Sequence, residues 1–406
     1  MNIKITDMKS ILTNCLALGA MLLMVSSCQD DIDRTLVHYS EEDYDVLTAR
    51  LDLPSQLYEY GVEEGDLINT GFGNNNTFIT GNERKNHIAT LGRVLFYDEQ
   101  LSINNTVSCA SCHEQTLAFA DNEMRSEGFE GQLSLRNSLP LGNTIGFEVA
   151  YGGGSFSQPR AAFGWDEANR NVSTQTEAAI TSTLEMGMHD MSQLAEKLAP
   201  IDYYQVLFRK AFGTDRVSED GILDALDEFV NSISSNRSKF DKAAMDQEDF
   251  GFVNVFVPFQ DFTTAENNGK AIYLANCANC HSADHSLTAV AIANNGLDVV
   301  SEDLGVGGHS GLDWDMGVFK VPFLRNVALT HPYMHDGRFT TLEEVVDFYS
   351  EGIQPHENLH PELKAFGTAK KFNFSDQEKS DLIAYLHTLT DEELLTEAKW
   401  SDPFKE

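Results

Sequence analysis

Basic residues and cysteines are scarce in this sequence. Its 406 residues include 28 Lys and Arg against 63 Asp and Glu, so the formal net charge is −35. This charge argues against nucleic acid or an anionic membrane surface as a binding partner, because both would repel the protein. Six cysteines are too few for a fold built on disulfides. The length predicts two or three domains, whose cores a hydrophobic content of 42% can fill.

An apolar run near the N-terminus, Ile11–Val25, follows two lysines and ends in small residues directly before Cys28. This layout is typical of a signal peptide and not of a membrane span. The ending Val25–Cys28 resembles the lipobox of bacterial lipoproteins, in which the cysteine is acylated and becomes the mature N-terminus. We expect residues 1–27 to be a lipoprotein signal peptide, with an ordinary secretory signal as the alternative. The protein is then expected in the periplasm, anchored to the outer membrane only through a lipid on Cys28.

Four cysteines occur in two pairs, each followed by a histidine. Residues 109–113 read CASCH and residues 277–281 read CANCH. The CxxCH pattern indicates c-type haem attachment, because two thiols one helical turn apart can each add to a vinyl group of one porphyrin. A zinc ribbon does not require a histidine after each pair, and a thioredoxin-type site needs only one pair. The predicted haem c attachment residues are Cys109, Cys112, Cys277 and Cys280, and the predicted proximal iron ligands are His113 and His281.

Helix-forming sequence surrounds both CxxCH motifs. Apolar residues recur at close to helical spacing in 87–97 and 268–275, and Ser375 with Glu378 forms a capping box before a further apolar run. These patterns predict a mainly α fold with two cytochrome c-like haem domains packed against each other, each with one covalent haem c. The expected parts are an acidic N-terminal segment at 28–87, a first haem domain at 88–250, a linker at 251–261, a second haem domain at 262–395 and a tail at 396–406.

Four further segments show a pattern shared with one known family. They are Leu91–Asp98, Ala118–Asp121, Arg136–Ser138 and Phe319–Gly337. Together with the two CxxCH motifs, they resemble the bacterial dihaem cytochrome c peroxidase and MauG family over roughly residues 88–395. The resemblance implies that the N-terminal haem is the peroxidatic one and that the C-terminal haem relays electrons.

The resemblance also implies roles for three residues between the two motifs. Trp165 matches the tryptophan that lies between the haems and assists electron transfer, Gln175 matches the distal glutamine, and Glu185 matches the distal glutamate. A carboxyl is needed there because peroxide bound to iron must lose a proton from one oxygen and gain one on the other as the O–O bond breaks. Gln175 would orient the peroxide by hydrogen bonding. Without the resemblance, Gln175 and Glu185 would be interpreted as a polar helix face and Trp165 as a core residue.

The sequence departs from the standard peroxidase pattern at the first haem. Many of these enzymes carry a histidine before the Arg-Asn-Ser segment, and it caps the peroxidatic iron until reduction releases it. Phe129 stands about where that histidine would be, and no histidine occurs between His113 and His189. The resemblance therefore implies a first haem with an open distal site, as in MauG.

A second departure concerns the sixth ligand of the relay haem. Standard peroxidases have a methionine fourteen residues after the histidine that matches His335, and this sequence has Tyr349 there, as MauG-like proteins do. A phenolate oxygen favours higher oxidation states of iron and lowers the potential, whereas a thioether raises it. In MauG this lets both haems share the oxidation. Met334 is the main alternative ligand, and Met316, His331 and His335 are also near in sequence.

The resemblance further implies a calcium ion between the haem domains. Asn137 and the backbone carbonyls of Thr330 and Pro332 match its ligands in the family. Oxygen donors of this kind suit a hard cation, so we expect a Ca²⁺ ion at these three residues.

These features lead to three hypotheses for the function. The first is an exported dihaem c-type peroxidase, with cytochrome c peroxidase activity, that reduces hydrogen peroxide to water. Its electrons would come from a small redox donor, such as a cytochrome c with a basic docking face. The second is a MauG-like enzyme that uses peroxide to oxidise Trp or Tyr side chains of a partner protein. The third is a non-catalytic dihaem electron carrier. Glu185 and the missing histidine argue against it, because an electron carrier needs neither an open site at the iron nor a carboxyl beside that site.

Overall fold

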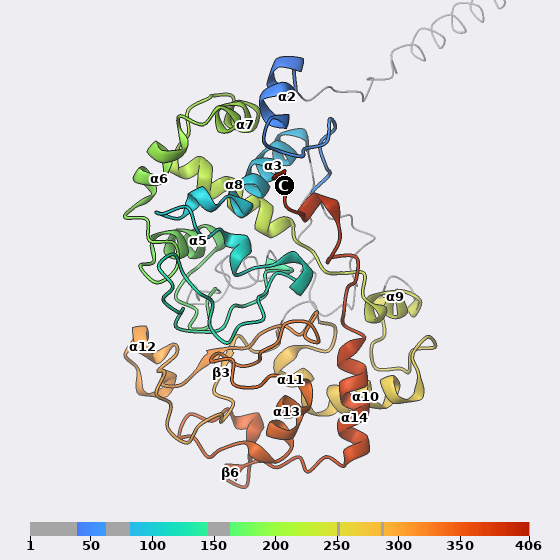
Figure 1. Cartoon of the computed structure of the whole chain (residues 1–406). Coiled ribbons are helices and arrows are strands. Elements are labelled where there is room, and N and C mark those ends of the chain that lie inside the picture. The colour runs from blue at the N-terminus through green and yellow to red at the C-terminus, as the bar shows by residue number, and fades with distance from the viewer. Residues whose placement is uncertain (1–38, 62–81, 145–162, 250–251, 286–287, 406) are drawn as a thin grey trace, which may run out of the picture.

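The computed structural model describes residues 39–61, 82–144, 163–249, 252–285 and 288–405. In this part of the chain the fold is mainly helical, which confirms the predicted fold class (Figure 1). The N-terminal half, through α8, and the C-terminal half, from α9, form two packed bodies. The expected signal peptide and Cys28 lie outside the described residues. No described helix has both the length and the apolar character needed to cross a membrane.

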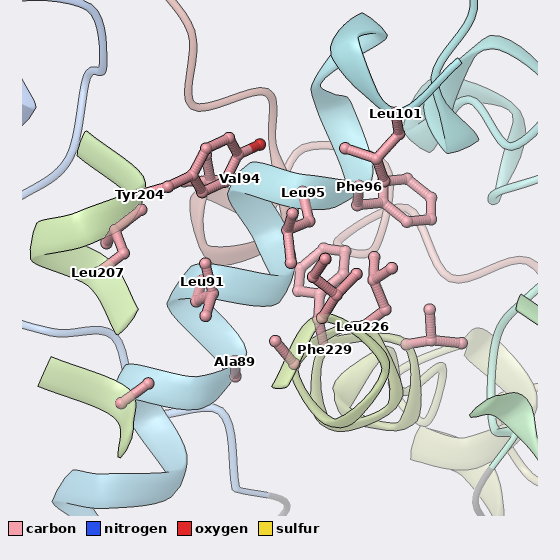
Figure 2. Close-up of a cluster of buried hydrophobic side chains, with 14 of the residues drawn as sticks. Ala89, Leu91, Val94, Leu95, Phe96, Leu101, Tyr204, Leu207, Leu226 and Phe229 are labelled. Atoms are coloured by element: carbon pink, nitrogen blue, oxygen red, sulfur yellow. The ribbon is translucent and has the colours of Figure 1, made fainter. Parts of the chain in front are cut away.

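The N-terminal half is built on α3, the long helix that precedes the first CxxCH motif. This helix buries an unbroken stretch from Ala89 to Phe96, because α7 and α8 both pack against it. Figure 2 shows its side chains between Leu207 of α7 and Leu226 and Phe229 of α8. Full burial of a large apolar side chain stabilises the fold by about 1.5–3 kcal/mol. The α-helices of this half are α2 (Glu41–Thr48), α3 (Glu83–Tyr97), α5 (Val172–Thr181), α6 (Met191–Leu198), α7 (Asp202–Phe212) and α8 (Glu219–Ser232).

The C-terminal half has a second core around α10 and α14. Helix α14 begins at the predicted capping box: Glu378 N–H donates to Ser375 Oγ at 3.3 Å, and Ser375 N–H donates to the Glu378 carboxylate at 2.8 Å. Its α-helices are α9 (Lys239–Met245), α10 (Thr264–Asn276), α11 (Ala278–His281), α12 (Gly307–Ser310), α13 (Leu342–Asp347) and α14 (Asp376–His387). A π-helical segment, Phe348–Gly352, continues α13.

The remaining regular structure is short. Antiparallel two-residue strands pair as β1 (Glu248–Asp249) with β2 (Phe252–Val253), β3 (Ile292–Ala293) with β4 (Phe319–Lys320), and β5 (Lys364–Ala365) with β6 (Thr368–Ala369). Single 3₁₀ turns cover Glu99–Leu101, Cys109–Ser111, Gln115–Leu117, Asp313–Asp315, Pro361–Leu363 and Ala398–Trp400. The first CxxCH motif lies on one of these turns.

One glycine in each half lets two helices cross at close range. A Cβ atom at Gly92 of α3 would lie 1.9 Å from the carbonyl oxygen of Ala225 in α8. A Cβ atom at Gly269 of α10 would likewise lie 1.9 Å from the carbonyl oxygen of Asp381 in α14. No larger residue fits at such a distance. In both halves, therefore, the helix before the CxxCH motif crosses a later helix of the same half in the same way.

The C-terminal end of the chain returns to the N-terminal half, as Figure 1 shows beside α3. Trp400 is 0% exposed, and its Nε1 donates to Ser232 Oγ of α8 at 3.2 Å. The Arg93 side chain of α3 donates to the carbonyl oxygen of Ser401 at 2.6 Å. We call residues 396–405 the C-terminal strap. This segment, expected as a tail, is part of the first core.

Candidate functional site

A cavity opens in the N-terminal half beside the first CxxCH motif. The motif forms one turn, in which His113 N–H donates to the carbonyl oxygen of Cys109 at 3.0 Å. Cys109, Cys112 and His113 all line the cavity. Much of the other lining is apolar and comes from α5 and α8, including Val172, Ile180, Leu226 and Val230. The turn therefore presents two thiols and one imidazole to the same space.

A hydrogen bond sets the orientation of His113. Its Nδ1 lies 2.9 Å from the carbonyl oxygen of Phe119, which accepts the ring proton and leaves Nε2 as the free nitrogen. The chain turns back to make this contact through two left-handed residues, Ala118 (φ 55°) and Phe119 (φ 60°). Burial lowers the pKa of His113, which favours the neutral imidazole that binds iron.

Gln175 and Glu185 line the same cavity as His113. Gln175 lies on α5, and the Asn169 side chain donates to its Oε1 at 2.9 Å, which leaves its amide group as a donor for a ligand. Glu185 follows α5, and its side chain is exposed because it borders the cavity. The protein around the cavity still removes much of the water from its carboxyl, and this desolvation raises the pKa of Glu185 to about 7. The structure thus brings together the proximal ligand and both predicted peroxide-site residues. The third predicted catalytic side chain, Trp165, lies elsewhere.

Phe129, at the place of the missing histidine, is not among the described residues that line the first cavity. A Cβ atom at Gly187 would lie 2.5 Å from its ring, so the ring packs tightly there. Its N–H donates to the carbonyl oxygen of Glu185 at 2.9 Å. Among the described lining residues, His113 is the one histidine, and Met186 contributes a thioether. The open distal site stays a prediction, which the spin state of the iron tests.

A second cavity lies beside the second CxxCH motif. The turn repeats the geometry of the first: His281 N–H donates to the carbonyl oxygen of Cys277 at 3.0 Å, and His281 Nδ1 lies 2.8 Å from the carbonyl oxygen of Pro322. Cys277, Cys280 and His281 line the cavity. In both halves the free thiols, the oriented imidazole and the adjoining space fit one covalently attached haem c.

The two main candidates for the sixth ligand of the second haem both line the second cavity. Tyr349 lies in the π-helical segment, and π-helical turns are frequent at functional sites. The Asn295 amide donates to Met334 Sδ at 3.5 Å, and it lies near enough to the Tyr349 hydroxyl to act against the rise in the pKa of Tyr349. Burial raises the pKa of Tyr349 to about 12, so its phenolate form requires a nearby cation such as ferric iron.

Met316, His331 and His335, which are also near this ligand position in sequence, lie differently. Neither Met316 nor His331 is among the described residues that line the second cavity. His335 lines it, but its ring stacks on Phe319 with the ring centroids 3.8 Å apart. Tyr349 therefore stays our prediction, with Met334 as its main rival.

Trp165 lies where the two halves meet. Two residues before it, Phe163 lines the first cavity, whereas Trp165 itself lines the second. Trp165 Nε1 donates to the carbonyl oxygen of Asn137 at 2.8 Å, and its own carbonyl accepts from Lys320 N–H of β4 at 2.7 Å. One short segment thus places aromatic rings at both cavities, which suits an electron path between them.

Arg136 holds the same boundary together. Its guanidinium donates to Asp166, the neighbour of Trp165, at 2.6 Å. It also donates to both carboxylate oxygens of Asp303 in the C-terminal half, at 2.7 and 2.9 Å. A bidentate guanidinium–carboxylate pair has a defined geometry. The ion pairs therefore restrain the position of Trp165 relative to the second cavity.

The residues expected to bind calcium, Asn137, Thr330 and Pro332, all line the second cavity. The Asn137 amide donates to the carbonyl oxygen of Glu123 at 3.1 Å, which leaves Oδ1 as the acceptor that a cation needs. In the described part of the chain, no cluster of three or more His, Cys, Asp or Glu side chains forms a metal site. The calcium site stays a prediction.

Sequence reasoning did not single out several groups that shape these sites. Asn169 positions Gln175, and Asn295 donates to Met334, one of the two candidate ligands of the second haem. The carbonyls of Phe119 and Pro322 orient the two proximal histidines. Both carbonyls lie in segments that carry the family resemblance, so the resemblance could have pointed to their role in orienting the histidines. No comparable pattern marks the two asparagines.

Comparison with known proteins adds independent support. A family model for di-haem cytochrome c peroxidase matches residues 86–249, and one for cytochrome c matches residues 266–390. The methylamine utilization protein MauG of Methylorubrum extorquens is 33% identical over 303 residues, which cover 74% of this chain and 77% of that protein. Cytochrome c551 peroxidase of Nitrosomonas europaea is 29% identical over 314 residues, which cover 75% and 80% respectively.

A solved structure shows the same relationship. The crystal structure of a MauG-like protein associated with microbial copper homeostasis is 29% identical in sequence, with a TM-score of 0.64. The match covers 87% of this chain and 98% of that one. These similarities confirm the family predicted from the sequence, and with it an oxidoreductase that acts on peroxide and carries haem c in cytochrome c-type domains. The chain belongs to the dihaem cytochrome c peroxidase and MauG family.

Proposed function

We propose that this protein is an exported peroxidase that reduces hydrogen peroxide to water at its N-terminal site, with electrons from a small redox donor. The observation that carries the proposal is that His113, Gln175 and Glu185 line one cavity beside two attachment thiols. A proximal ligand, an orienting amide and a titratable carboxyl are the groups that peroxide cleavage needs.

Haem supplies the redox chemistry when bound, and the chain supplies orientation and protons. Asn169 occupies Gln175 Oε1, so the Gln175 amide N–H groups remain to donate to a peroxide oxygen. With a pKa of about 7, Glu185 is present as both acid and base near neutral pH. It can therefore take a proton from one peroxide oxygen and return it to the other.

Electrons would reach the N-terminal site along the segment that joins the two cavities. Trp165 lines the second cavity, and Phe163 lines the first. Hydrogen bonds from Trp165 to Asn137 and from Lys320 to Trp165 hold this segment against both halves. The proposed role of the C-terminal site is to accept electrons from the donor and pass them along this path.

Steady-state peroxide turnover with a reduced cytochrome c tests the proposal. We expect Glu185→Gln to lower kcat/KM for peroxide by about 10²- to 10⁴-fold, the usual loss when a general acid–base is removed. The matched control is Glu177→Gln, because Glu177 is an exposed carboxyl on α5 that is not among the described cavity residues. Equal rates in the two variants would contradict the assignment of Glu185.

The spin state of the ferric protein separates an enzyme from an electron carrier. A haem-stained gel and an electron paramagnetic resonance (EPR) spectrum should show two haems, with the first high-spin because its distal site is open. Two low-spin haems and no reaction with stoichiometric peroxide would instead indicate a non-catalytic carrier.

A second candidate function is MauG-like oxidation of Trp or Tyr side chains in a partner protein. The position of Tyr349 in the lining of the second cavity favours it, because a phenolate ligand would stabilise oxidised iron. Negligible turnover with donors in both wild type and Glu185→Gln, with a long-lived oxidised state after peroxide addition, would support this function over the first. If Tyr349 is the ligand, the ferric wild type should lack the sulfur-to-iron absorption band of a His–Met haem. That band in wild type and Tyr349→Phe alike would indicate Met334.

A further inference from the structure

A buried network of hydrogen-bonded side chains lies beside the second CxxCH turn. It consists of Tyr273 from α10, His285 from the loop after α11, and Tyr385 from α14. These side chains are 0%, 1% and 0% exposed, respectively. The proposed peroxide chemistry uses none of them. We call them the Tyr–His–Tyr network.

The hydrogen bonds give the network a direction for proton transfer. The Tyr385 hydroxyl lies 2.7 Å from His285 Nε2. On the other side of the ring, Nδ1 lies 3.5 Å from the Tyr273 hydroxyl, which itself donates to the carbonyl oxygen of Ser282 at 2.6 Å. Because Tyr273 gives its proton to Ser282, its oxygen is left to accept from Nδ1–H. Nε2 is then the acceptor, and Tyr385 donates its phenolic proton to it.

Tyr273 connects the network to the second cavity. It lines that cavity together with Cys277 and His281, and its hydroxyl lies 3.2 Å from the carbonyl oxygen of His281. The ring centroids of Tyr273 and Tyr385 are 5.2 Å apart, the usual spacing of an aromatic pair in contact. An electron therefore has a short path from Tyr385 through Tyr273 to the cavity.

The surroundings keep His285 neutral at rest and provide anions for its charged form. Burial, together with the nearby Arg325, lowers the pKa of His285 to about 3, so the ring is neutral at rest and its unprotonated Nε2 accepts the hydrogen bond from Tyr385. The charges of Asp284 and Asp241 raise the pKa of His285, whereas His281 lowers it further. Arg325 is itself paired with Asp241 at 2.7 Å. A proton on His285 would thus lie near two buried carboxylates.

We propose that Tyr385 and His285 form a redox-active pair that takes up one oxidising equivalent from the second haem site. Tyr385 loses one electron, which passes by way of Tyr273 to the haem centre that peroxide has oxidised. The phenolic proton moves to His285 Nε2 along the existing 2.7 Å hydrogen bond. The products are a neutral tyrosyl radical, an imidazolium and a haem centre reduced by one electron. An electron from a donor reverses both transfers.

The coupled proton transfer is what makes a buried tyrosine oxidisable. Without it the positive charge would stay on the phenol as a radical cation; with it the charge lies on His285, near the carboxylates of Asp284 and Asp241. The hydrogen bond to His285 lets the proton leave without any movement of the side chains. The pair would hold an oxidising equivalent away from the haem when electron donors are scarce. The inference rests on peroxide reactivity at the haem sites and not on the identity of the donor.

Tyr204 offers a matched comparison in the N-terminal half. It is 0% exposed, and its hydroxyl donates to the Asp98 carboxylate at 2.7 Å. It is not, however, among the described residues that line either cavity. A radical that formed on any buried tyrosine with a proton acceptor would use Tyr204 as readily as Tyr385.

The test is EPR spectroscopy of the full-length dihaem protein, frozen after mixing with stoichiometric hydrogen peroxide in the absence of a donor. We expect an organic radical signal in the wild type, with lines that narrow when the protein contains ring-deuterated tyrosine. Tyr385→Phe should lose most of the signal, Tyr204→Phe should retain it, and His285→Gln should lower its yield. Haem absorbance and thermal unfolding check that each variant is folded. The deuteration result needs no variant.

Three outcomes would overturn the inference. A wild type that consumes peroxide without forming a tyrosine radical would overturn it and leave the proposed function intact. An unchanged signal in folded Tyr385→Phe, or equal losses in Tyr385→Phe and Tyr204→Phe, would also overturn it. A protein that does not consume peroxide at all would contradict both the inference and the proposed function.

Discussion

At the scale of single residues, Glu185 shows how strongly the surroundings determine chemistry. A glutamate in water is ionised at neutral pH, but desolvation at the first cavity raises the pKa of Glu185 to about 7. The role of Gln175 depends instead on geometry, because the hydrogen bond from Asn169 decides which of its amide atoms remains available. Charge and orientation at one cavity thus come from different neighbours.

The pKa of Glu185 leads to a prediction about pH dependence. Below pH 7 the carboxyl is mostly protonated, and above it the carboxylate that accepts the first peroxide proton predominates. We therefore expect kcat/KM for peroxide to rise with pH through about 7 and then level off. Glu185→Gln should lose this inflection, whereas Glu177→Gln should keep it. The same inflection in Glu185→Gln would assign the titration to another group.

At the scale of elements, the C-terminal strap couples the end of the chain to the first haem turn. Trp400 is buried against α8, and Arg93 of α3 binds the backbone of the strap. Gln115, two residues after His113, donates to the carbonyl oxygens of Leu394 and Glu397, both at 3.0 Å. The last residues of the chain therefore help to hold the loop that carries the first proximal ligand.

Truncation of Trp400 tests this coupling. We expect Trp400→Ala to destabilise the N-terminal half by about 3–5 kcal/mol, the usual cost of removing a buried tryptophan side chain. Denaturation monitored by haem absorbance, with amide exchange in α3 and α8, would measure the loss. Trp314→Ala is the control, because Trp314 is 67% exposed and should change little. Equal effects of the two substitutions would show that the strap does not stabilise this half.

At the scale of the whole molecule, charge and export define the expected partner. The formal charge of −35 favours a donor with a basic docking face, and haem propionates would add to the negative charge. The signal-peptide layout supports our proposal that the protein is periplasmic and anchored by a lipid on Cys28. Residues 1–28 lie outside the described part of the chain. The donor and the enzyme would then meet in the same compartment.

The charge predicts a steep salt dependence for turnover with a basic cytochrome c. The screening length falls from about 30 Å at 0.01 M salt to about 3 Å at 1 M, so attraction between the two proteins weakens. We expect the second-order rate constant with the cytochrome to fall steeply over this range, and the rate with a small neutral donor to change little. Similar salt responses for the two donors would argue against electrostatic docking.

Local patterns predicted some features well. The capping box at Ser375 and Glu378 starts α14 as expected, because its two hydrogen bonds involve residues only three positions apart. The course of the last residues was not predictable in the same way. Trp400 donates a hydrogen bond to Ser232, which lies 168 residues earlier in the sequence. Nothing near Trp400 in the sequence distinguishes a buried strap from an exposed tail.

The sequence by itself determined the attachment chemistry and, through the family resemblance, the family. Each CxxCH motif is contiguous, so the chain's covalent spacing brings its two thiols and histidine together whatever the rest of the fold does. Only the tertiary structure decided which distant groups meet: Asn169 with Gln175, Trp165 with the second cavity, and His285 with Tyr385. The physical reason is that such contacts depend on how whole helices and loops pack, which no local spacing encodes.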